Sequence, residues 1–267
     1  MQNKKGGEMN ARIALAVGLV LAGLAPALGL AQQAAGLYRP APKLPEPKYA
    51  PQYSSMEDQH DLSGVWFIRD YNRRFRTPIN TLPPLTAFGK AELDKRIKAE
   101  TDGTPYADAS THCWPHGIPR VMNSPYPIQI IHSPGKITIV HEVAHNIRQI
   151  HMDQPMPATV PTSFLGYSVG HWEGNTLVIE TKGTDPRTWI DEEGILHSDK
   201  LYTVERIRKV ENGENLENEV TMIDPVYFTR PWVKKINYAW RPDLRVSEYI
   251  CEENNRNAPQ NGVTVAK

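Results

Sequence analysis

Residues 136–151 read K-I-T-I-V-H-E-V-A-H-N-I-R-Q-I-H, and the conformation of this stretch decides the fold class. β-Branched residues are frequent in it, which favours a strand over a helix. Apolar residues alternate with more polar ones, and a period of two residues fits this pattern better than a period of 3.6. Pro134-Gly135, directly before it, indicates a turn. The pattern therefore predicts one extended strand over residues 137–151.

The same stretch contains H-E-V-A-H at 141–145, which matches the H-E-x-x-H motif of zinc hydrolases. In that motif both histidines bind zinc from one helical turn. On a strand, His141 and His145 would lie roughly 13 Å apart, too far for one zinc ion to bind both at about 2 Å. We therefore expect no metal at this motif and keep a zinc hydrolase as the second alternative function. Histidines that would reach a metal across neighbouring strands are His132, His151 and His171.

The chain beyond residue 127 predicts antiparallel hairpins in series, without crossover helices. A first strand is expected over 61–68 and a helix over 86–100, with Thr86 as N-cap and Leu93 and Ile97 on its apolar stripe. Later strands are expected over 128–132, 137–151, 167–172, 176–181, 201–210, 216–223, 233–240 and 245–251. The predicted fold is mainly β: a single antiparallel, lipocalin-like β-barrel, or a sandwich, with one helix inserted after the first strand.

The first hairpin also has a predicted register. If it turns at Pro134-Gly135, residues whose numbers sum to about 269 face each other. Ile128 then pairs with His141, and His132 pairs with Ile137. One face of the pair would carry Tyr126, Ile128, Ile130, His132, His141, Val143 and His145. Such a face suits a ligand cavity, and it equally suits a core with a few hydrogen-bonded histidines.

The N-terminal residues resemble an export signal. Lys4, Lys5 and Arg12 precede a nearly unbroken apolar run over residues 13–30, and small residues end it. This pattern predicts a signal peptide over 1–31, with an uncleaved membrane anchor as the alternative. A Pro-rich arm over 32–60, a β-barrel domain over 61–256 and a tail over 257–267 would follow. The protein is thus expected to be periplasmic or secreted, away from the membrane once the signal is cleaved.

Composition excludes several classes of partner. The 267 residues include 30 Lys and Arg and 30 Asp and Glu, so the formal net charge is zero. A neutral chain has no overall attraction to nucleic acid or to an anionic membrane. It contains no Gly-rich phosphate loop and no cofactor fingerprint, so we expect no cofactor. Six tryptophans and eleven tyrosines could line a pocket for a small apolar or aromatic molecule.

Cys113 and Cys251 are the two cysteines of the chain. In an oxidising compartment, two cysteines far apart in sequence most simply form one disulfide. A nucleophilic or metal-binding thiol is the alternative. The disulfide would attach the long Pro- and Gly-containing loop over residues 101–127 to the C-terminal part of the domain.

Several motifs resemble those of a large family of exported bacterial proteins that has no agreed activity. They are C-W-P-H-G-I-P-R-V-M at 113–122, E-V-A-H-N-I-R-Q-I-H-M-D at 142–153, G-Y-S-V-G-H-W-E-G-N-T-L-V-I-E-T at 166–181 and E-Y-I-C-E-E-N-N at 248–255. The resemblance implies secretion and a β-rich domain, and it supplies no mechanism. Within it, Glu142, His145 and Arg148 match shared positions. Gly64-Val65-Trp66 is similar to the Gly-x-Trp of lipocalin-type barrels.

Five residues are candidates for acid–base chemistry: His145, Arg148, Glu142, His197 and Asp191. His145 or His197 would transfer the proton, a carboxylate would orient the histidine, and Arg148 would stabilise developing negative charge. Asp191 would orient His197 within one loop. Glu142 and His145 fall on opposite faces of a regular strand, so their cooperation requires a bulge.

These observations predict an exported β-barrel that binds a small apolar or aromatic molecule. The first hypothesis is a cofactor-independent lyase, isomerase or hydrolase that uses histidine and carboxylate chemistry. The alternative is a non-catalytic carrier of a hydrophobic ligand. Convergence of the candidate polar residues in an open cavity would favour the enzyme, whereas an apolar cavity would favour the carrier.

Overall fold

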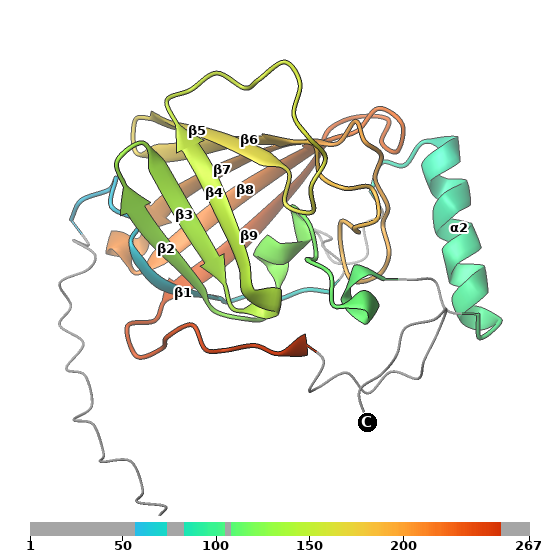
Figure 1. Ribbon diagram of the computed structural model, residues 1–267, viewed down its shortest axis with the longest axis horizontal. Coiled ribbons are helices and arrows are strands. Elements are labelled where there is room, and N and C mark those ends of the chain that lie inside the picture. The colour runs from blue at the N-terminus through green and yellow to red at the C-terminus, as the bar shows by residue number, and fades with distance from the viewer. Residues whose placement is uncertain (1–56, 74–82, 105–107, 252–267) are drawn as a thin grey trace, which may run out of the picture. The chain divides into compact units, whose positions relative to one another are not determined.

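The computed structural model describes residues 57–73, 83–104 and 108–251, and this part of the chain is mainly β-structure. Its strands form a closed barrel in the order of the chain, from β1 to β9 (Figure 1). The strands are β1 (Gly64–Ile68), β2 (Ile128–Ser133), β3 (Lys136–His141), β4 (Asn146–Met152), β5 (Tyr167–Glu173), β6 (Thr176–Lys182), β7 (Tyr202–Val210), β8 (Asn215–Ile223) and β9 (Trp232–Trp240). The predicted barrel is confirmed.

The predicted signal peptide and C-terminal tail lie outside the described residues, as does nearly all of the Pro-rich arm. Within the ranges that are described, no helix is both long enough and apolar enough to span a bilayer.

The register predicted for the first hairpin is confirmed. Ile128 pairs with His141, and His132 pairs with Ile137, across β2 and β3. The turn contains Gly135 at φ 70°, a left-handed conformation that glycine adopts without a steric penalty.

The prediction of one strand over residues 137–151 is wrong, because the chain reverses in the middle of that stretch. β3 ends at His141, a 3₁₀ turn covers Val143–His145, and β4 begins at Asn146. Ala144 and His145 have φ values of 52° and 48°, so the backbone there is left-handed and cannot continue a strand. His141 consequently faces the barrel interior while His145 is exposed, and the predicted shared face ends at His141.

The strand predicted over residues 245–251 is also absent from the structure. Two of its backbone amides donate to side chains instead of to a neighbouring strand. Ser247 N donates to Glu142 Oε2 at 2.8 Å, and Tyr249 N donates to His145 Nε2 at 2.7 Å. We call residues 245–251 the strap. Hydrogen bonds from its backbone amides to the Glu142 and His145 side chains hold it in place.

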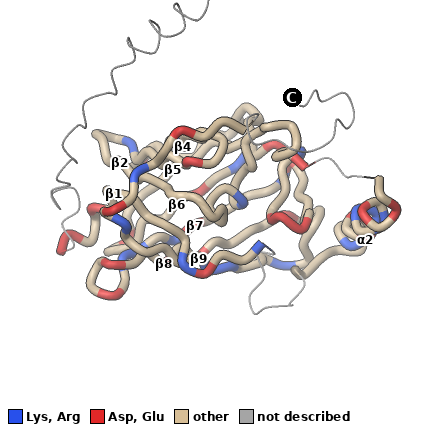
Figure 2. The backbone as a smooth tube through the Cα atoms, turned by 90° about the horizontal axis from the view of Figure 1, so that it is seen from below, with Lys and Arg blue, Asp and Glu red and all other residues tan. Residues whose placement is uncertain are grey.

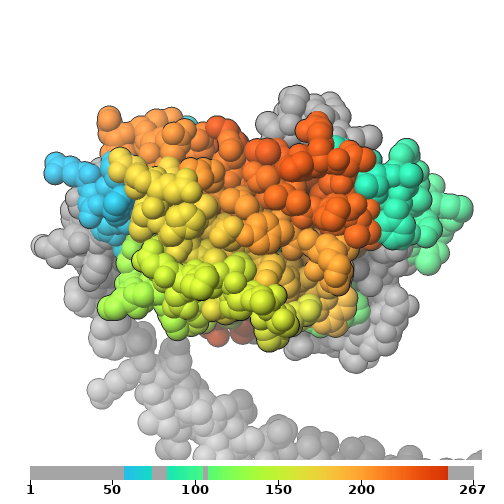
Figure 3. Space-filling model, turned by 90° about the horizontal axis from the view of Figure 1, so that it is seen from above, coloured from blue at the N-terminus to red at the C-terminus, as the bar shows by residue number. Residues whose placement is uncertain are grey.

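The predicted helix is confirmed as α2 (Ala87–Thr101), and the Thr86 side chain caps it by accepting from Gly89 N at 3.0 Å. Leu93 is buried as expected, but Ile97 is 46% exposed, so the predicted apolar stripe is too wide. Gly89 allows close packing, since a Cβ there would lie 2.6 Å from Tyr227 O. Figure 3 shows the helix at one end of the barrel, beside the segment that follows β8.

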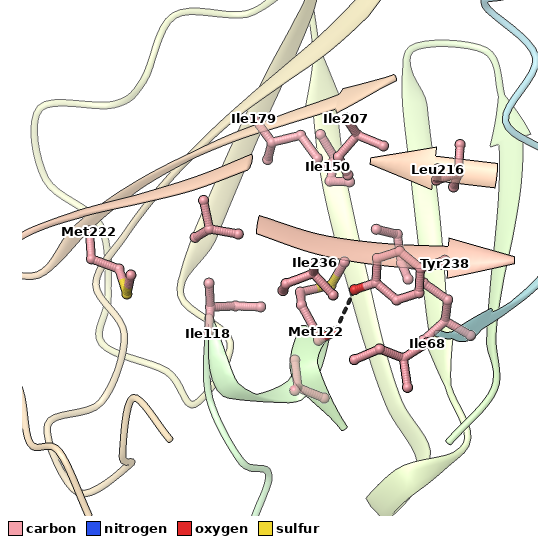
Figure 4. Packing of buried hydrophobic residues seen from close by; sticks show 14 of the residues in the cluster. Ile68, Ile118, Met122, Ile150, Ile179, Ile207, Leu216, Met222, Ile236 and Tyr238 are labelled. Atoms are coloured by element: carbon pink, nitrogen blue, oxygen red, sulfur yellow. Dashed lines mark hydrogen bonds between the residues drawn. The ribbon is translucent and has the colours of Figure 1, made fainter. Parts of the chain in front are cut away.

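The segment between α2 and β2 fills one end of the barrel. It contains two 3₁₀ turns, η1 (Ala109–His112) and η2 (Arg120–Asn123). Ile118 and Met122 are at most 1% exposed and pack beneath Ile236 and Tyr238 of β9 (Figure 4). The Tyr238 hydroxyl donates to the backbone oxygen of Met122. We call residues 109–124 the plug, because their side chains occupy space that an open barrel would leave to solvent.

A disulfide joins the plug to the C-terminal strap. Cys113 and Cys251 are 138 residues apart in sequence, and their Cα atoms lie 5.7 Å apart. This confirms the predicted pairing. The strap is thus held at Glu142, at His145 and at the disulfide, so the C-terminal segment of the barrel domain is tied to the plug and to the turn between β3 and β4.

We expect replacement of both cysteines by serine to lower the free energy of unfolding by about 3–5 kcal/mol, because the unfolded chain loses the constraint of a long closed loop. Urea denaturation of the oxidised proteins measures this difference. Under reducing conditions the two proteins should unfold at the same urea concentration. Equal midpoints for the oxidised proteins would contradict the expected contribution.

Candidate functional site

A cluster of polar side chains lies inside the barrel, where a small closed barrel usually holds apolar ones. Its members project inward from β3 to β8, and each residue is at most 2% exposed. We call this cluster the polar core; it consists of His141, Arg148, Ser168, Thr181, Thr203, Glu205 and Asn218.

Arg148 and Glu205 form an ion pair at the centre of the polar core, with side chains that are 1% and 0% exposed. Arg148 Nε donates to Ser168 Oγ at 3.1 Å, and its Nη2 donates to Thr181 Oγ1 at 2.9 Å. Asn218 Nδ2 donates to the other Glu205 oxygen at 3.0 Å. These bonds meet the condition for burying two charges, which is that each be paired and further hydrogen-bonded.

Other polar atoms of the same cluster have no hydrogen-bond partner among the described residues. They are both ring nitrogens of His141, Arg148 Nη1, Thr203 Oγ1 and Asn218 Oδ1. A buried polar group left without a partner costs about 1–3 kcal/mol, and most such groups in proteins are paired. Such atoms on four inward-facing residues indicate a site that accepts a polar group.

The polar core has no net charge near neutral pH. Burial, together with smaller electrostatic contributions from Arg148 and His116, lowers the pKa of His141 to about 3. The imidazole is therefore neutral, and the positive charge of Arg148 is matched by Glu205. Burial also raises the pKa of Tyr238 well above its ordinary value, so this neighbouring hydroxyl stays protonated.

The barrel wall has a seam beside the polar core. β4 and β5 run parallel, and their register covers residues 150–152 against residues 168–170. Before that point, residues 146–149 of β4 face residues 163–167 without strand pairing. Parallel pairs are less stable per residue than antiparallel ones, so a short parallel ladder is the weakest join in this wall.

A pocket of about 360 Å³ lies at the seam, lined by residues 147–149, His151 and residues 163–168. Its apolar lining includes Ile147, which is 60% exposed, together with Phe164 and Leu165. Tyr167 stacks on His151 with ring centroids 4.7 Å apart. Arg148 and Ser168 belong both to the pocket lining and to the polar core. The apolar pocket therefore adjoins the polar core at these two residues.

The structure places three of the predicted catalytic residues around β4 but does not bring them together. Arg148 faces the interior, whereas Glu142 and His145 bind the strap at Ser247 and Tyr249. The H-E-x-x-H sequence therefore forms a turn whose Glu142 and His145 side chains hydrogen-bond to the strap. Among the described residues, no group of three or more histidine, cysteine or carboxylate side chains could hold a metal ion.

His197 and Asp191 hydrogen-bond within the loop between β6 and β7. His197 is 2% exposed, and its ring nitrogens lie 2.9 Å from Thr188 Oγ1 and 3.0 Å from Ser198 O. Asp191 Oδ1 accepts from the amides of Glu193 and Ile195, each at 3.0 Å. Neither ring nitrogen of His197 bonds to Asp191, so the predicted orienting contact is replaced by contacts to Thr188 and Ser198.

Sequence reasoning missed Glu205 and Asn218, although a signal for both exists. In β7 and β8 the buried residues alternate, and Glu205 falls in phase with Ile207 while Asn218 falls in phase with Val220. A charged or amide residue in phase with core positions indicates a buried polar site. Residues of both charge signs are distributed along β8, β9 and α2 (Figure 2), so their charge alone does not single out Glu205.

No protein-family model matches this chain, and no curated protein matches its sequence.

We expect Glu205→Gln to lower the free energy of unfolding by about 3–5 kcal/mol, because it leaves the buried Arg148 charge without its counter-charge. Glu173→Gln is the matched control: it removes an ion pair with Arg206 in which the Glu173 side chain is 49% exposed. That change should have little effect on the free energy of unfolding, because water screens an exposed ion pair. Chemical denaturation of both variants at pH 7 measures the difference, and equal losses would show that the buried pair is not central to stability.

Stability should also fall as the pH drops below about 6.5. Burial lowers the pKa of His116 to about 4 and that of His141 to about 3, so both stay neutral in the folded protein while the unfolded chain binds a proton at each. Each group then removes about 1.4 kcal/mol of stability per pH unit between the unfolded and folded pKa values.

Denaturation of His141→Leu between pH 7 and pH 4 tests this contribution. The variant should lose stability with a slope about 1.4 kcal/mol per pH unit shallower than the wild type. His171→Gln, which changes a histidine whose side chain is 44% exposed, should retain the wild-type slope. A His141→Leu slope as steep as the wild type would rule out a neutral buried imidazole.

Proposed function

We propose that this protein is an exported barrel that binds a small molecule with an apolar or aromatic body in the pocket beside β4. The observation that carries the proposal is the pocket of about 360 Å³, which shares Arg148 and Ser168 with the polar core. Small-molecule sites are typically concave and apolar, with a few polar groups that fix orientation. The seam pocket has this combination.

The shape of the barrel supports a ligand at the seam rather than along the barrel axis. The plug closes one end with Ile118 and Met122, and inward apolar side chains fill much of the interior. At the seam the wall has a parallel ladder of only residues 150–152 against 168–170, so a ligand would approach the buried polar groups there without displacing the plug.

Binding is favoured over the acid–base chemistry predicted from the sequence. Glu142 and His145 are engaged with the strap, and His197 and Asp191 are engaged within their own loop. Of the five candidate residues, Arg148 alone lines the pocket, and a guanidinium remains protonated at all ordinary pH values. An arginine supplies recognition, whereas proton transfer needs a group that titrates.

Export is supported by the N-terminal residues and by the cysteines. Basic residues precede a long apolar run that ends in small residues, as in a secretory signal. The disulfide between Cys113 and Cys251 persists in oxidising compartments and is rare in reducing ones.

We expect the purified protein to bind N-phenyl-1-naphthylamine, a neutral aromatic probe whose fluorescence rises in an apolar site. Ile147→Glu should weaken this binding about tenfold, because it replaces an apolar contact at the mouth by a hydrated carboxylate. Ile131→Glu is the control, since Ile131 is 41% exposed on the outer side of β2 and lies outside the pocket lining.

Fluorescence titration of the three proteins gives the dissociation constants. Equal weakening by the two substitutions would place the probe elsewhere, and no rise in fluorescence with the wild type would contradict the proposed function.

A further inference from the structure

We propose that the polar core recognises a neutral group of the ligand that both accepts and donates hydrogen bonds, such as a primary amide or an alcohol. This inference rests on the proposed function, because the apolar body of the ligand is assigned to the seam pocket. It adds the chemical class of the ligand's polar end.

The unpartnered atoms of the polar core include both kinds of hydrogen-bonding partner. Arg148 Nη1 carries two N–H donors, and Asn218 Oδ1 is an acceptor. The Thr203 hydroxyl and the neutral His141 ring each combine a donor with an acceptor. A ligand group with only acceptors would leave Asn218 Oδ1 without a donor, so a group with both functions is the better complement.

Arg148 and Asn218 belong to one hydrogen-bonded network, and Thr203 lies beside it. Asn218 donates to Glu205 at 3.0 Å, and Glu205 pairs with Arg148. Arg148 donates to Thr181 Oγ1 at 2.9 Å, and Thr181 is the register partner of Thr203 across β6 and β7. The free donors and acceptors of Arg148, Asn218 and Thr203 therefore lie on or beside this network in the barrel interior.

Charge selects against an ionised ligand group. The guanidinium of Arg148 is already matched by Glu205, so a carboxylate brought to Arg148 would also meet the negative charge of Glu205. An ammonium group would meet Arg148 itself. Because His141 is neutral, nothing in the cluster compensates an added charge in this buried place, and a neutral polar group has the smallest desolvation cost.

The polar core is also arranged at the expense of stability. Valine has nearly the shape of threonine, and at position 203 it would remove a buried hydroxyl that has no partner among the described residues. The chain instead holds Thr203 in a position where apolar residues are the rule, as Ile207 shows two positions further along the same face of β7. Retained polar groups of this kind are typical of binding sites.

The geometry also gives the order in which a ligand meets these groups. Arg148 and Ser168 line the pocket, whereas Thr203, Asn218 and His141 do not. A polar end entering from the seam meets Arg148 first and reaches the remaining groups behind it. Specificity for the polar end should therefore depend on a residue that is remote from the mouth.

Three probes that share one ring system test the proposal: 2-naphthamide, 2-naphthoate and 2-methylnaphthalene. They are titrated by fluorescence against the protein purified after expression of the full chain. We expect the amide to bind about tenfold more tightly than either of the others, because a buried hydrogen-bonding site discriminates against ligands that cannot complete its bonds. This comparison uses the wild type alone and does not depend on a variant folding.

Thr203→Val provides the second readout. It should reduce the preference for the amide by at least about threefold, leave 2-methylnaphthalene binding unchanged, and melt at the same temperature as the wild type or higher. Thr221→Val, on the outer side of β8, is the matched control and should leave the preference intact.

The outcomes separate the two proposals. Equal affinity for amide and methyl probes, or tighter binding of the naphthoate, would overturn the inference and leave the proposed function standing. Failure of all three probes to bind would overturn the proposed function and the inference with it. A Thr203→Val protein that keeps the full amide preference would also overturn the inference.

Discussion

The buried ion pair between Arg148 and Glu205 links β4 to β7 across the side of the barrel that contains the weak β4–β5 join. Arg148 stands on β4, and its hydrogen bonds reach Ser168 on β5, Thr181 on β6 and Glu205 on β7. Each bond crosses the seam from the inside. Because the parallel ladder between β4 and β5 is short, these side-chain hydrogen bonds supplement the backbone pairing that joins the two strands.

The same arrangement creates the site. Arg148 bonds across the seam and therefore lies next to it, and the pocket lies at the same seam. The two buried charges need hydrogen bonds from several hydroxyl and amide side chains. Those side chains bring further donors and acceptors into the barrel interior, which apolar residues would otherwise fill. Stability of the wall and recognition by the pocket therefore depend on one set of residues.

The H-E-V-A-H stretch shows how a motif depends on its backbone. Its histidines end on opposite sides of the wall, with His141 inside and His145 outside, because a left-handed turn separates them. Glu142 and His145 accept backbone amides of the strap, so two segments more than 100 residues apart form one structural unit. Here Glu142 and His145 bind the protein's own backbone. In a zinc hydrolase the histidine would bind the metal and the glutamate would act as the base.

The mainly β class, the capped helix, the register of the first hairpin and the disulfide could be predicted from the sequence, because period, turn residues and cysteine pairing are local or few in number. The choice between barrel and sandwich could not. The sequence also singled out Arg148. Three features became visible in the folded chain alone: the turn between β3 and β4, the binding of the strap by Glu142 and His145, and the contacts of Glu205 with Arg148 and Asn218. Those contacts join residues tens of positions apart, and barrel closure, rather than any local preference, brings them within hydrogen-bonding distance.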